Sequence, residues 1–244
     1  MTSKRSHSRL AILALTALLG LAGLGLNLTP AHAADGPSIF VFLPNDMRAR
    51  AFEKLLTTAM PGVDITVFGR LKDFQNNIKK APPDAVLTMR AVIDQQKGVS
   101  AILQGAAGGK TQESYVLISV DQPASLADKP VIGVVDILGR KKMPSFVSEI
   151  VNTKTKVKRV AKPEDLLSLL QFKMVDAILL PKAGYDQLKS KTELKLVVSD
   201  APGRVFLPAV GFLSTNHKDT LASAVKKLDG EVSKIIRVSS WRAN

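Results

Sequence analysis

The chain has 244 residues, no cysteine, three histidines and a formal net charge of +13. Without cysteine it can form no disulfide, thiol nucleophile or cysteine-ligated metal site. Only one histidine, His217, lies beyond the first 33 residues, which excludes a multi-histidine metal site there. His217 follows Ser214-Thr215-Asn216, where entry to a helix or a surface position is expected. The positive charge favours acidic partners, although lysine and arginine are spread along the chain.

The N-terminal segment has the organisation of a secretory signal peptide. Lys4, Arg5 and Arg9 precede an apolar run, Leu10 to Leu26, and Ala31-His32-Ala33 ends the segment in a small-x-small pattern. We therefore expect cleavage after Ala33 and export of the remaining chain. A retained membrane anchor is the alternative, because the apolar run approaches the roughly 20 residues that span a bilayer.

The first half of the exported chain alternates buried strands with amphipathic helices, which predicts an α/β fold with mainly parallel sheets. Strands are predicted at residues 38–43, 63–68, 84–89 and 101–103. Helices are predicted after the first strand, at 71–80 and at 90–96. Asp46 is expected to cap the first helix.

A glycine-rich stretch, Gly105 to Gly109, precedes a strand predicted at Tyr115 to Val120. Gly109-Lys110-Thr111 matches the end of the phosphate-binding pattern GxxxxGK[ST], but Gln104 stands where its first glycine belongs. The following residues are typical of a strand, whereas a phosphate-binding loop opens a helix. We interpret the stretch as a hinge whose strand crosses between two domains. An ordinary connection within one domain is the alternative.

The second half continues the alternation. Strands are predicted at residues 131–137, 154–159, 176–180, 194–198 and 205–213, with helices from 144, from 163 and over 221–236. The lysines of 154–159 are typical of an edge strand, and the lack of interleaved aromatics argues against nucleic-acid binding. Asp84-Ala85 and Asp176-Ala177 each introduce an apolar run, which forms a short internal echo across the glycine stretch.

Several segments occur in an order typical of one family of exported proteins. They are the strand before Asp46, the strand Asp84 to Arg90, Tyr115 to Ile118, Ser125 to Asp128 before Ile132 to Asp136, and Val175 to Pro181. Together they resemble the type II periplasmic solute-binding proteins, specifically the phosphate/phosphonate-binding-like branch. The resemblance covers nearly the whole exported chain.

This resemblance implies an α/β fold of two lobes joined by a hinge. Lobe 1 would comprise residues 34–108 and 205–244, and lobe 2 residues 112–202, after a signal peptide at 1–33. It also implies a monomeric periplasmic protein that needs no cofactor, binds a small molecule and serves an inner-membrane transporter.

The loop expected to grip a phosphonate departs from the family pattern. In phosphonate binders the loop after the first strand of the second lobe resembles Ser-Thr-Ser-Gly at a helix N-terminus, where hydroxyl and N–H groups hold the anion. The corresponding residues 136–143 contain no hydroxyl and begin with an acid, Asp136. Arg140, Lys141 and Lys142 could still attract an anion or form a solvated surface.

In open α/β sheets, ligands meet the loops beyond the carboxyl ends of the strands. Here these loops are rich in apolar residues: Leu43, Pro44, Met47, Met89, Ile137, Leu138, Met143, Pro181, Leu207 and Pro208. Methionine suits a large irregular apolar ligand, although such residues also close the cores of lobes.

Nine residues are our candidates for ligand binding. They are Asn45, Asp46, Met89, Arg90, Glu113, Tyr115, Leu138, Arg140 and Tyr185. Glu113 and Tyr115 are two apart on a strand and therefore share a face. There they could jointly bind one hydroxyl or form a structural pair.

We therefore expect a non-enzymatic periplasmic binding protein that carries a largely apolar, lipid-type ligand. Bacterial sterol-transport systems use a binding protein of similar fold, which makes a sterol-like molecule the specific hypothesis. The alternatives are the substrate-binding component of an ABC importer for phosphonate or another organic anion, and an enzyme on the same fold. The lack of cysteine and the single histidine argue against the enzyme. No catalytic residue, metal or cofactor is predicted.

Overall fold

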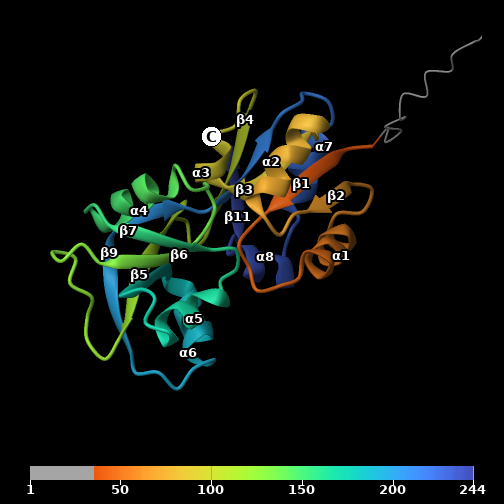
Figure 1. The fold of residues 1–244 in the computed structure, drawn as a ribbon. Helices are drawn as coiled ribbons and strands as arrows, with labels where there is room; N and C mark the ends of the chain where they lie inside the picture. The colour runs from red at the N-terminus through yellow and green to blue at the C-terminus, as the bar shows by residue number, and fades with distance from the viewer. Residues whose placement is uncertain (1–35, 100, 244) are drawn as a thin grey trace, which may run out of the picture. The chain divides into compact units, whose positions relative to one another are not determined.

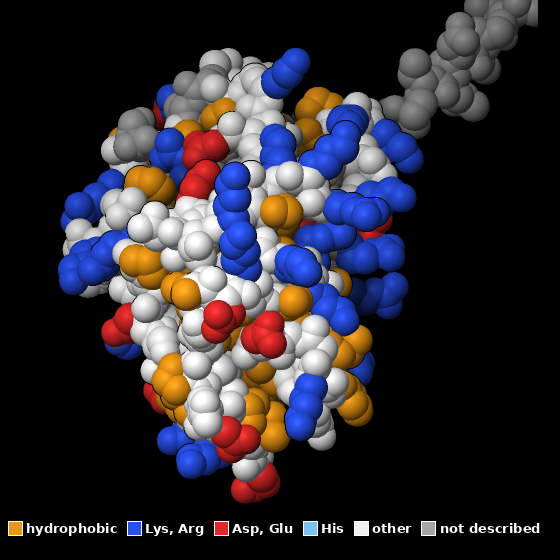
Figure 2. Space-filling view, turned by 60° about the vertical axis from the view of Figure 1, so that its left-hand side comes forward, with side chains coloured by type: hydrophobic (Ala, Val, Ile, Leu, Met, Phe, Trp, Pro, Cys, Tyr) orange, Lys and Arg blue, Asp and Glu red, His pale blue; other side chains and the backbone are white. Residues whose placement is uncertain are grey.

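The structure is a computed structural model that describes residues 36–99 and 101–243. The predicted signal peptide and its cleavage site lie outside the described residues. None of the helices in the described ranges is both long enough and apolar enough to span a membrane. Lysine and arginine side chains occur across the face shown in Figure 2, with aspartate and glutamate between them.

Two β-sheets with interspersed helices form the fold (Figure 1). The six-stranded sheet has the order β11-β4-β10-β3-β1-β2, and the five-stranded sheet has the order β7-β6-β8-β5-β9. In the larger sheet, β1, β2 and β3 are parallel, while β4, β10 and β11 run antiparallel to their neighbours. We call the larger sheet with its helices lobe 1 and the smaller sheet with its helices lobe 2.

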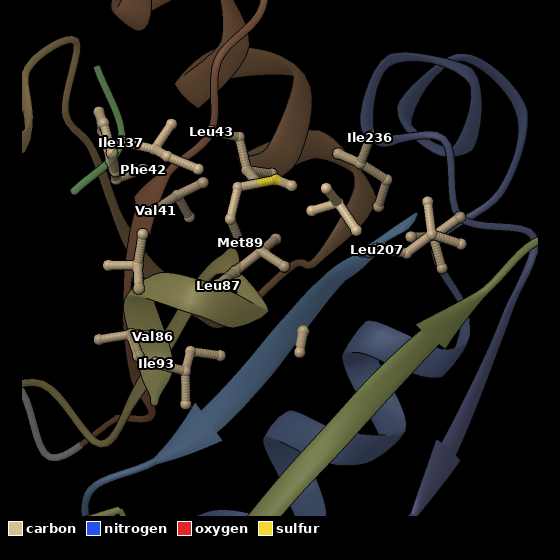
Figure 3. Packing of buried hydrophobic residues seen from close by; sticks show 14 of the residues in the cluster. Val41, Phe42, Leu43, Val86, Leu87, Met89, Ile93, Ile137, Leu207 and Ile236 are labelled. Carbon is tan, nitrogen blue, oxygen red and sulfur yellow. The ribbon is translucent and has the colours of Figure 1, made fainter. Parts of the chain in front are cut away.

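The elements of lobe 1 come from both ends of the described chain. They are β1 (Ser38–Phe42), α1 (Ala49–Ala59), β2 (Asp64–Val67), α2 (Leu71–Lys80), β3 (Ala85–Met89), α3 (Arg90–Ile93), β4 (Ala101–Ala106), β10 (Pro208–Phe212), α7 (Lys218–Lys226), α8 (Gly230–Ile236) and β11 (Ser240–Ala243). Side chains from several of them meet in its core, where Leu43, Met89, Leu207 and Ile236 lie close together (Figure 3).

The elements of lobe 2 are continuous in sequence. They are β5 (Gln112–Val120), β6 (Val131–Val135), α4 (Met143–Val151), β7 (Lys156–Val160), α5 (Asp165–Gln171), β8 (Ala177–Pro181), the 3-10 helix η1 (Lys182–Gly184), α6 (Tyr185–Lys189) and β9 (Leu196–Phe206). The predicted edge strand is confirmed, because β7 lies at the end of its sheet.

The chain passes between the sheets twice, from β4 to β5 and from β9 to β10. The two passages lie side by side, since the Leu207 N–H donates to the Thr111 carbonyl at 2.9 Å. Gly108 and Gly109, with φ of +54° and +77°, form a tight turn between β4 and β5. A strand follows Lys110-Thr111, as predicted, whereas a phosphate-binding loop would open a helix there. Whether the turn acts as a hinge stays a prediction.

Gly105 has a different role from the one predicted for it. It lies within β4 and pairs with Trp241 of β11. An added Cβ would lie 2.5 Å from the Pro208 carbonyl oxygen and 2.6 Å from Val238 Cγ2. This glycine therefore permits close packing of neighbouring segments, and backbone freedom is not what the position requires.

Near the end of the chain, the boundaries of several elements differ from the prediction. The segments 194–198 and 205–213 do contain strands, but the division between them was wrong, because β9 continues through Pro202 to Phe206 and β10 begins at Pro208. Pro202 is tolerated because β9 is an edge strand and its register with β5 shifts nearby. The helix predicted over 221–236 is broken into α7 and α8 before Gly230, whose φ is +54°. Strand β11 was not predicted.

The predictions for the N-termini of two helices, α1 and α7, had different outcomes. Asp46 does not cap α1, which begins at Ala49 after Arg48 and has no side-chain cap. His217 confirms its predicted place at a helix entry, because it precedes the first residue of α7.

Candidate ligand-binding site

A cavity of about 440 Å³ is lined by residues of both lobes. Lobe 1 contributes the loop Pro44–Met47 after β1, Met89 at the end of β3, and Lys234, Ile235 and Arg237 at the end of α8. Lobe 2 contributes the ends of β6 and β8 and one face each of α4 and α5. The cavity thus lies beyond the carboxyl ends of parallel strands, where open α/β sheets bind ligands.

The walls of the cavity are mostly apolar. Lobe 2 provides Val134, Val135, Ile137, Met143, Phe146, Val147, Leu166, Leu167, Leu179, Leu180 and Leu188. Met143, Phe146 and Val147 recur at helical spacing and therefore share one face of α4. A space of this size and lining suits a small molecule with a large apolar surface.

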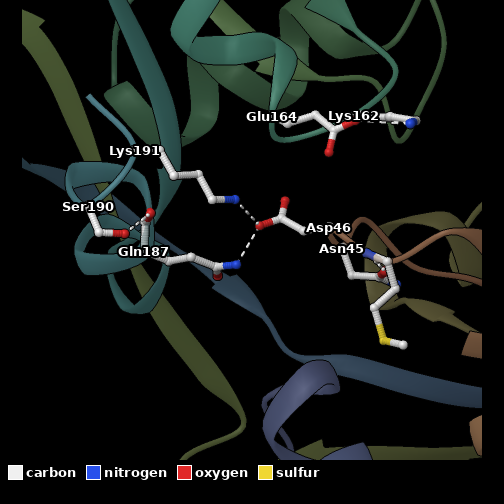
Figure 4. A network of polar contacts seen from close by, with 8 residues as sticks. Asn45, Asp46, Lys162, Glu164, Gln187, Ser190 and Lys191 are labelled. Carbon is white, nitrogen blue, oxygen red and sulfur yellow. Dashed lines mark hydrogen bonds and ion pairs between the residues drawn. The ribbon is translucent and has the colours of Figure 1, made fainter. Parts of the chain in front are cut away.

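The loop after β1 links the two lobes across this cavity. Asn45 folds the loop on itself, because its Oδ1 accepts from the Met47 N–H at 2.8 Å and its Nδ2 donates to the Leu43 carbonyl at 3.1 Å. Asp46 is thereby directed to lobe 2, where Lys191 Nζ and Gln187 Nε2 both donate to its carboxylate (Figure 4). The Asp46–Lys191 distance is 2.9 Å.

A second interlobe contact joins Glu113 of β5 to Arg237 after α8. The Arg237 guanidinium donates to Glu113 Oε1 at 3.0 Å. Burial raises the pKa of Glu113, and the charge and hydrogen bond of Arg237 oppose this rise. Burial and the Glu113 charge raise the pKa of Tyr115, so that its phenol is neutral near pH 7.

Four of the nine predicted site residues line the cavity: Asn45, Asp46, Met89 and Tyr115. Glu113 is absent from the lining, and its carboxylate binds Arg237. Of this pair, Tyr115 therefore lines the cavity, whereas Glu113 forms an ion pair with Arg237.

The other four predicted residues lie outside the lining. Arg90 pairs with Asp94 at 2.7 Å and stacks over the Phe206 ring at 5.7 Å. Leu138 is buried in the core and Arg140 is exposed. Tyr185 packs partly buried against the core of lobe 2.

The apolar loop residues divide in the same way. Pro44, Met47, Met89, Ile137, Met143 and Pro181 line the cavity. Leu43, Leu138, Leu207 and Pro208 are buried elsewhere and close the cores.

Charged cavity residues from helix ends did not appear among the predictions. Glu164 and Lys191 flank helices of lobe 2, while Lys234 belongs to the last turn of α8 and Arg237 directly follows that helix. No motif marks them, because their relation to the cavity depends on how α8 and α5 pack. Among the described residues, no group of three or more histidine, aspartate or glutamate side chains could hold a metal ion.

Neither the known family models nor the curated protein sequences contain a match to this chain. Solved structures do match. The binding protein component of an ABC phosphonate transporter from Pseudomonas aeruginosa has a TM-score of 0.56 and 15% identity, over 86% of this chain and 82% of that one. The BvgS VFT2 domain of Bordetella pertussis, as a double mutant, has a TM-score of 0.53 and 13% identity, over 82% and 91%.

A third structure, an arginine-bound variant of ArgBP from T. maritima, has a TM-score of 0.51 and 15% identity, over 82% of this chain and 94% of that one. At these identities the likeness defines the fold alone. The chain has the two-lobe α/β fold of periplasmic binding proteins, with a cavity lined by both lobes.

Proposed function

We propose that this chain is a periplasmic solute-binding protein that carries a largely apolar, lipid-type molecule, such as a sterol, to a membrane transporter. The observation that carries the proposal is the apolar lining of the interlobe cavity. A small, highly charged ion would lose its hydration in such a space without enough polar partners to replace it. An apolar ligand instead gains roughly 25 cal/mol per Å² of surface removed from water.

The magnitude of binding follows from ligand size. A sterol-sized ligand of about 30 heavy atoms, at roughly −0.3 kcal/mol per atom, would bind with about −9 kcal/mol. This corresponds to a sub-micromolar dissociation constant.

The loop that would hold a phosphonate supports the same proposal. The carboxylate of Asp136 accepts from the Gly139 N–H at 2.7 Å and also pairs with Arg159. The loop thus uses its own acid to hold its shape, and it presents Ile137 and Met143 to the cavity.

We propose a binding role and no catalysis. His217 contacts Asp84 at 3.4 Å, but neither residue lines the cavity. A nucleophile activated by histidine therefore has no support in the cavity lining that the structure describes.

Import of a phosphonate or another organic anion is the second candidate. Its support is the similar fold of the phosphonate transporter component and the presence of Lys234 and Arg237 in the lining. Titration calorimetry with cholesterol in detergent, decanol, methylphosphonate and inorganic phosphate separates the two. We expect sub-micromolar to micromolar binding of the apolar probes, little changed by salt. Tight binding of methylphosphonate or phosphate with no affinity for the apolar probes would overturn the first proposal.

A further inference from the structure

The charges that line the cavity are unequally compensated. Asp46 pairs with Lys191 at 2.9 Å, and Glu164 pairs with Lys162 at 3.0 Å. Lys234 also lines the cavity, and no acidic partner of it is found in the described part of the chain. The uncompensated positive charge therefore belongs to the end of α8.

Arg237 adds unused hydrogen-bond donors at the same place. A guanidinium carries five N–H donors, and the structure describes one hydrogen bond from this side chain, to Glu113. Its Nε is buried and has no partner among the described residues. A buried donor without an acceptor is costly, so such an atom needs an explanation.

The backbone holds Arg237 in this place. Its φ is +58°, a left-handed conformation that is uncommon for a residue with a side chain. The N–H groups of Arg237 and Val238 both donate to the Ser233 carbonyl, which closes the end of α8. Ile236 points into the lobe 1 core beside Leu43 and Met89 (Figure 3). The turn thus buries Ile236 and leaves the flanking Ile235 and Arg237 at the cavity.

We infer that the end of α8 is a head-group subsite, in which Arg237 and Lys234 bind the singly charged acidic head of an amphiphilic ligand. This inference rests on the proposed function, since the apolar walls would hold the body of the same ligand. Arg237 and Lys234 together carry two positive charges, and Glu113 offsets one of them. One negative charge, such as a carboxylate, balances the remainder. The neutral Tyr115 phenol in the lining can donate to the same head.

The charge count distinguishes this head from a phosphate. A phosphate dianion would leave one negative charge uncompensated beside apolar walls, where burial of an unpaired charge is strongly unfavourable. A carboxylate also matches the planar donor fork of an arginine. Glu113 acts as a positioning residue, because it orients the guanidinium through one hydrogen bond and does not line the cavity.

Decanoate and decanol test the inference, since they share one alkyl chain and differ in the head. We expect the protein to bind decanoate about tenfold or more tighter than decanol at pH 7.5, as a charge-assisted hydrogen bond allows. Arg237→Gln should remove most of this preference and leave decanol binding within about threefold. Lys234→Gln, at an exposed position, should reduce the preference as well.

Two variants separate a ligand role from a structural one. Glu113→Gln keeps a hydrogen-bonding side chain but removes the opposing charge, so it should maintain or increase the decanoate preference. Arg242→Gln removes an exposed arginine outside the cavity lining and should leave the preference unchanged. A purely structural role of Arg237 would instead make Arg237→Gln and Glu113→Gln weaken both ligands alike.

The subsite and the proposed function are overturned by different results. Equal affinity of the wild-type protein for decanoate and decanol overturns the subsite and leaves the proposed function standing. A preference that Arg242→Gln removes as much as Lys234→Gln overturns the subsite too, since it reflects surface charge. If neither decanoate nor decanol binds and methylphosphonate binds tightly, both the proposed function and the subsite are overturned. Thermal melting of each variant reports whether it is folded.

Discussion

Asp84 and Asp176 occupy equivalent places in the two sheets. Asp84 directly precedes β3, and its Oδ2 accepts from the N–H of Ser38, the first residue of the neighbouring β1, at 3.0 Å. Asp176 directly precedes β8, and its Oδ2 accepts from the N–H of Val131, the first residue of the neighbouring β6, at 2.7 Å. Each carboxylate thus satisfies the leading donor of a parallel strand. This shared task explains why the Asp-Ala echo occurs once in each lobe.

We expect Asp84→Ala to lower the free energy of unfolding by about 1–3 kcal/mol, because it leaves the N–H of Ser38 without its acceptor. Asp176→Ala should cost less, since the hydrogen bond of Asp176 is exposed. Urea denaturation of both variants measures these changes. Asp128→Ala, in an exposed loop, is the matched control. A cost for Asp84→Ala no larger than for this control would contradict the assignment.

The titration of Glu113 should make the stability of the protein depend on pH. Its pKa is raised in the folded protein by burial, which Arg237 partly offsets. A folded pKa above the unfolded value means that the folded state holds its proton longer. The contribution of Glu113 is therefore fully present below the usual value of 4.5 and is lost as pH rises through the folded value.

Glu113→Gln removes this titration. The stability of the wild-type protein relative to the variant should consequently fall as pH increases from 4 through the window above 4.5. Urea midpoints for both proteins at several pH values check this sign. A constant difference, or one that grows with pH, would show that the carboxyl is not shifted upward.

The contact of Asp46 with Lys191 and Gln187 should influence ligand release more than stability. The ion pair is partly exposed, and such pairs contribute about 0–1 kcal/mol to folding. It nevertheless connects the two lobes at the cavity. Asp46→Ala should therefore increase the dissociation rate of a bound apolar dye, N-phenyl-1-naphthylamine, about two- to tenfold. Stopped-flow fluorescence measures this rate.

Asp200→Ala provides the control for that experiment. Asp200 pairs with Lys182 at 2.9 Å, the same distance, but both residues belong to lobe 2 and neither lines the cavity. Its dissociation rate should match the wild-type value. Equal rates for all three proteins would mean that the Asp46 contact does not retain the ligand.

Gly105→Ala should be strongly destabilising. The new Cβ would meet the Pro208 carbonyl oxygen at 2.5 Å, and a backbone atom cannot move aside as the end of a flexible side chain can. We expect a loss of about 1–3 kcal/mol in unfolding free energy, the usual cost of overpacking. Gly69→Ala adds the same methyl group with no atom within 4 Å and should change stability little. Similar urea midpoints for the two variants would contradict this packing.

Local patterns in the sequence were sufficient for most elements of the fold. The helix predicted at 71–80 is α2, in which Leu71 and Phe74 are buried and Lys79 and Lys80 occupy the last turn. Its periodicity determines one apolar face, and a lysine-rich ending complements the helix dipole. The strand after the glycine turn and the edge position of β7 were predicted for similar local reasons. The α/β class followed from the alternation of these elements, although the predicted mainly parallel pairing was wrong, because antiparallel strands complete both sheets. The two lobes were implied by the resemblance to the type II periplasmic solute-binding proteins.

The tertiary structure alone decided which charged groups meet at the cavity. Asp46 and Lys191 are 145 residues apart, and Glu113 and Arg237 are 124 apart. No short-range pattern encodes either contact, because each depends on the packing of one lobe against the other. Tertiary packing also decides the extent of β9. This strand continues through Pro202 because it pairs with β5 and lies at the edge of its sheet, where the missing N–H of proline leaves no hydrogen bond unmade. Periodicity determines which face of an element is buried, but only packing determines what that face and its flanking charges contact.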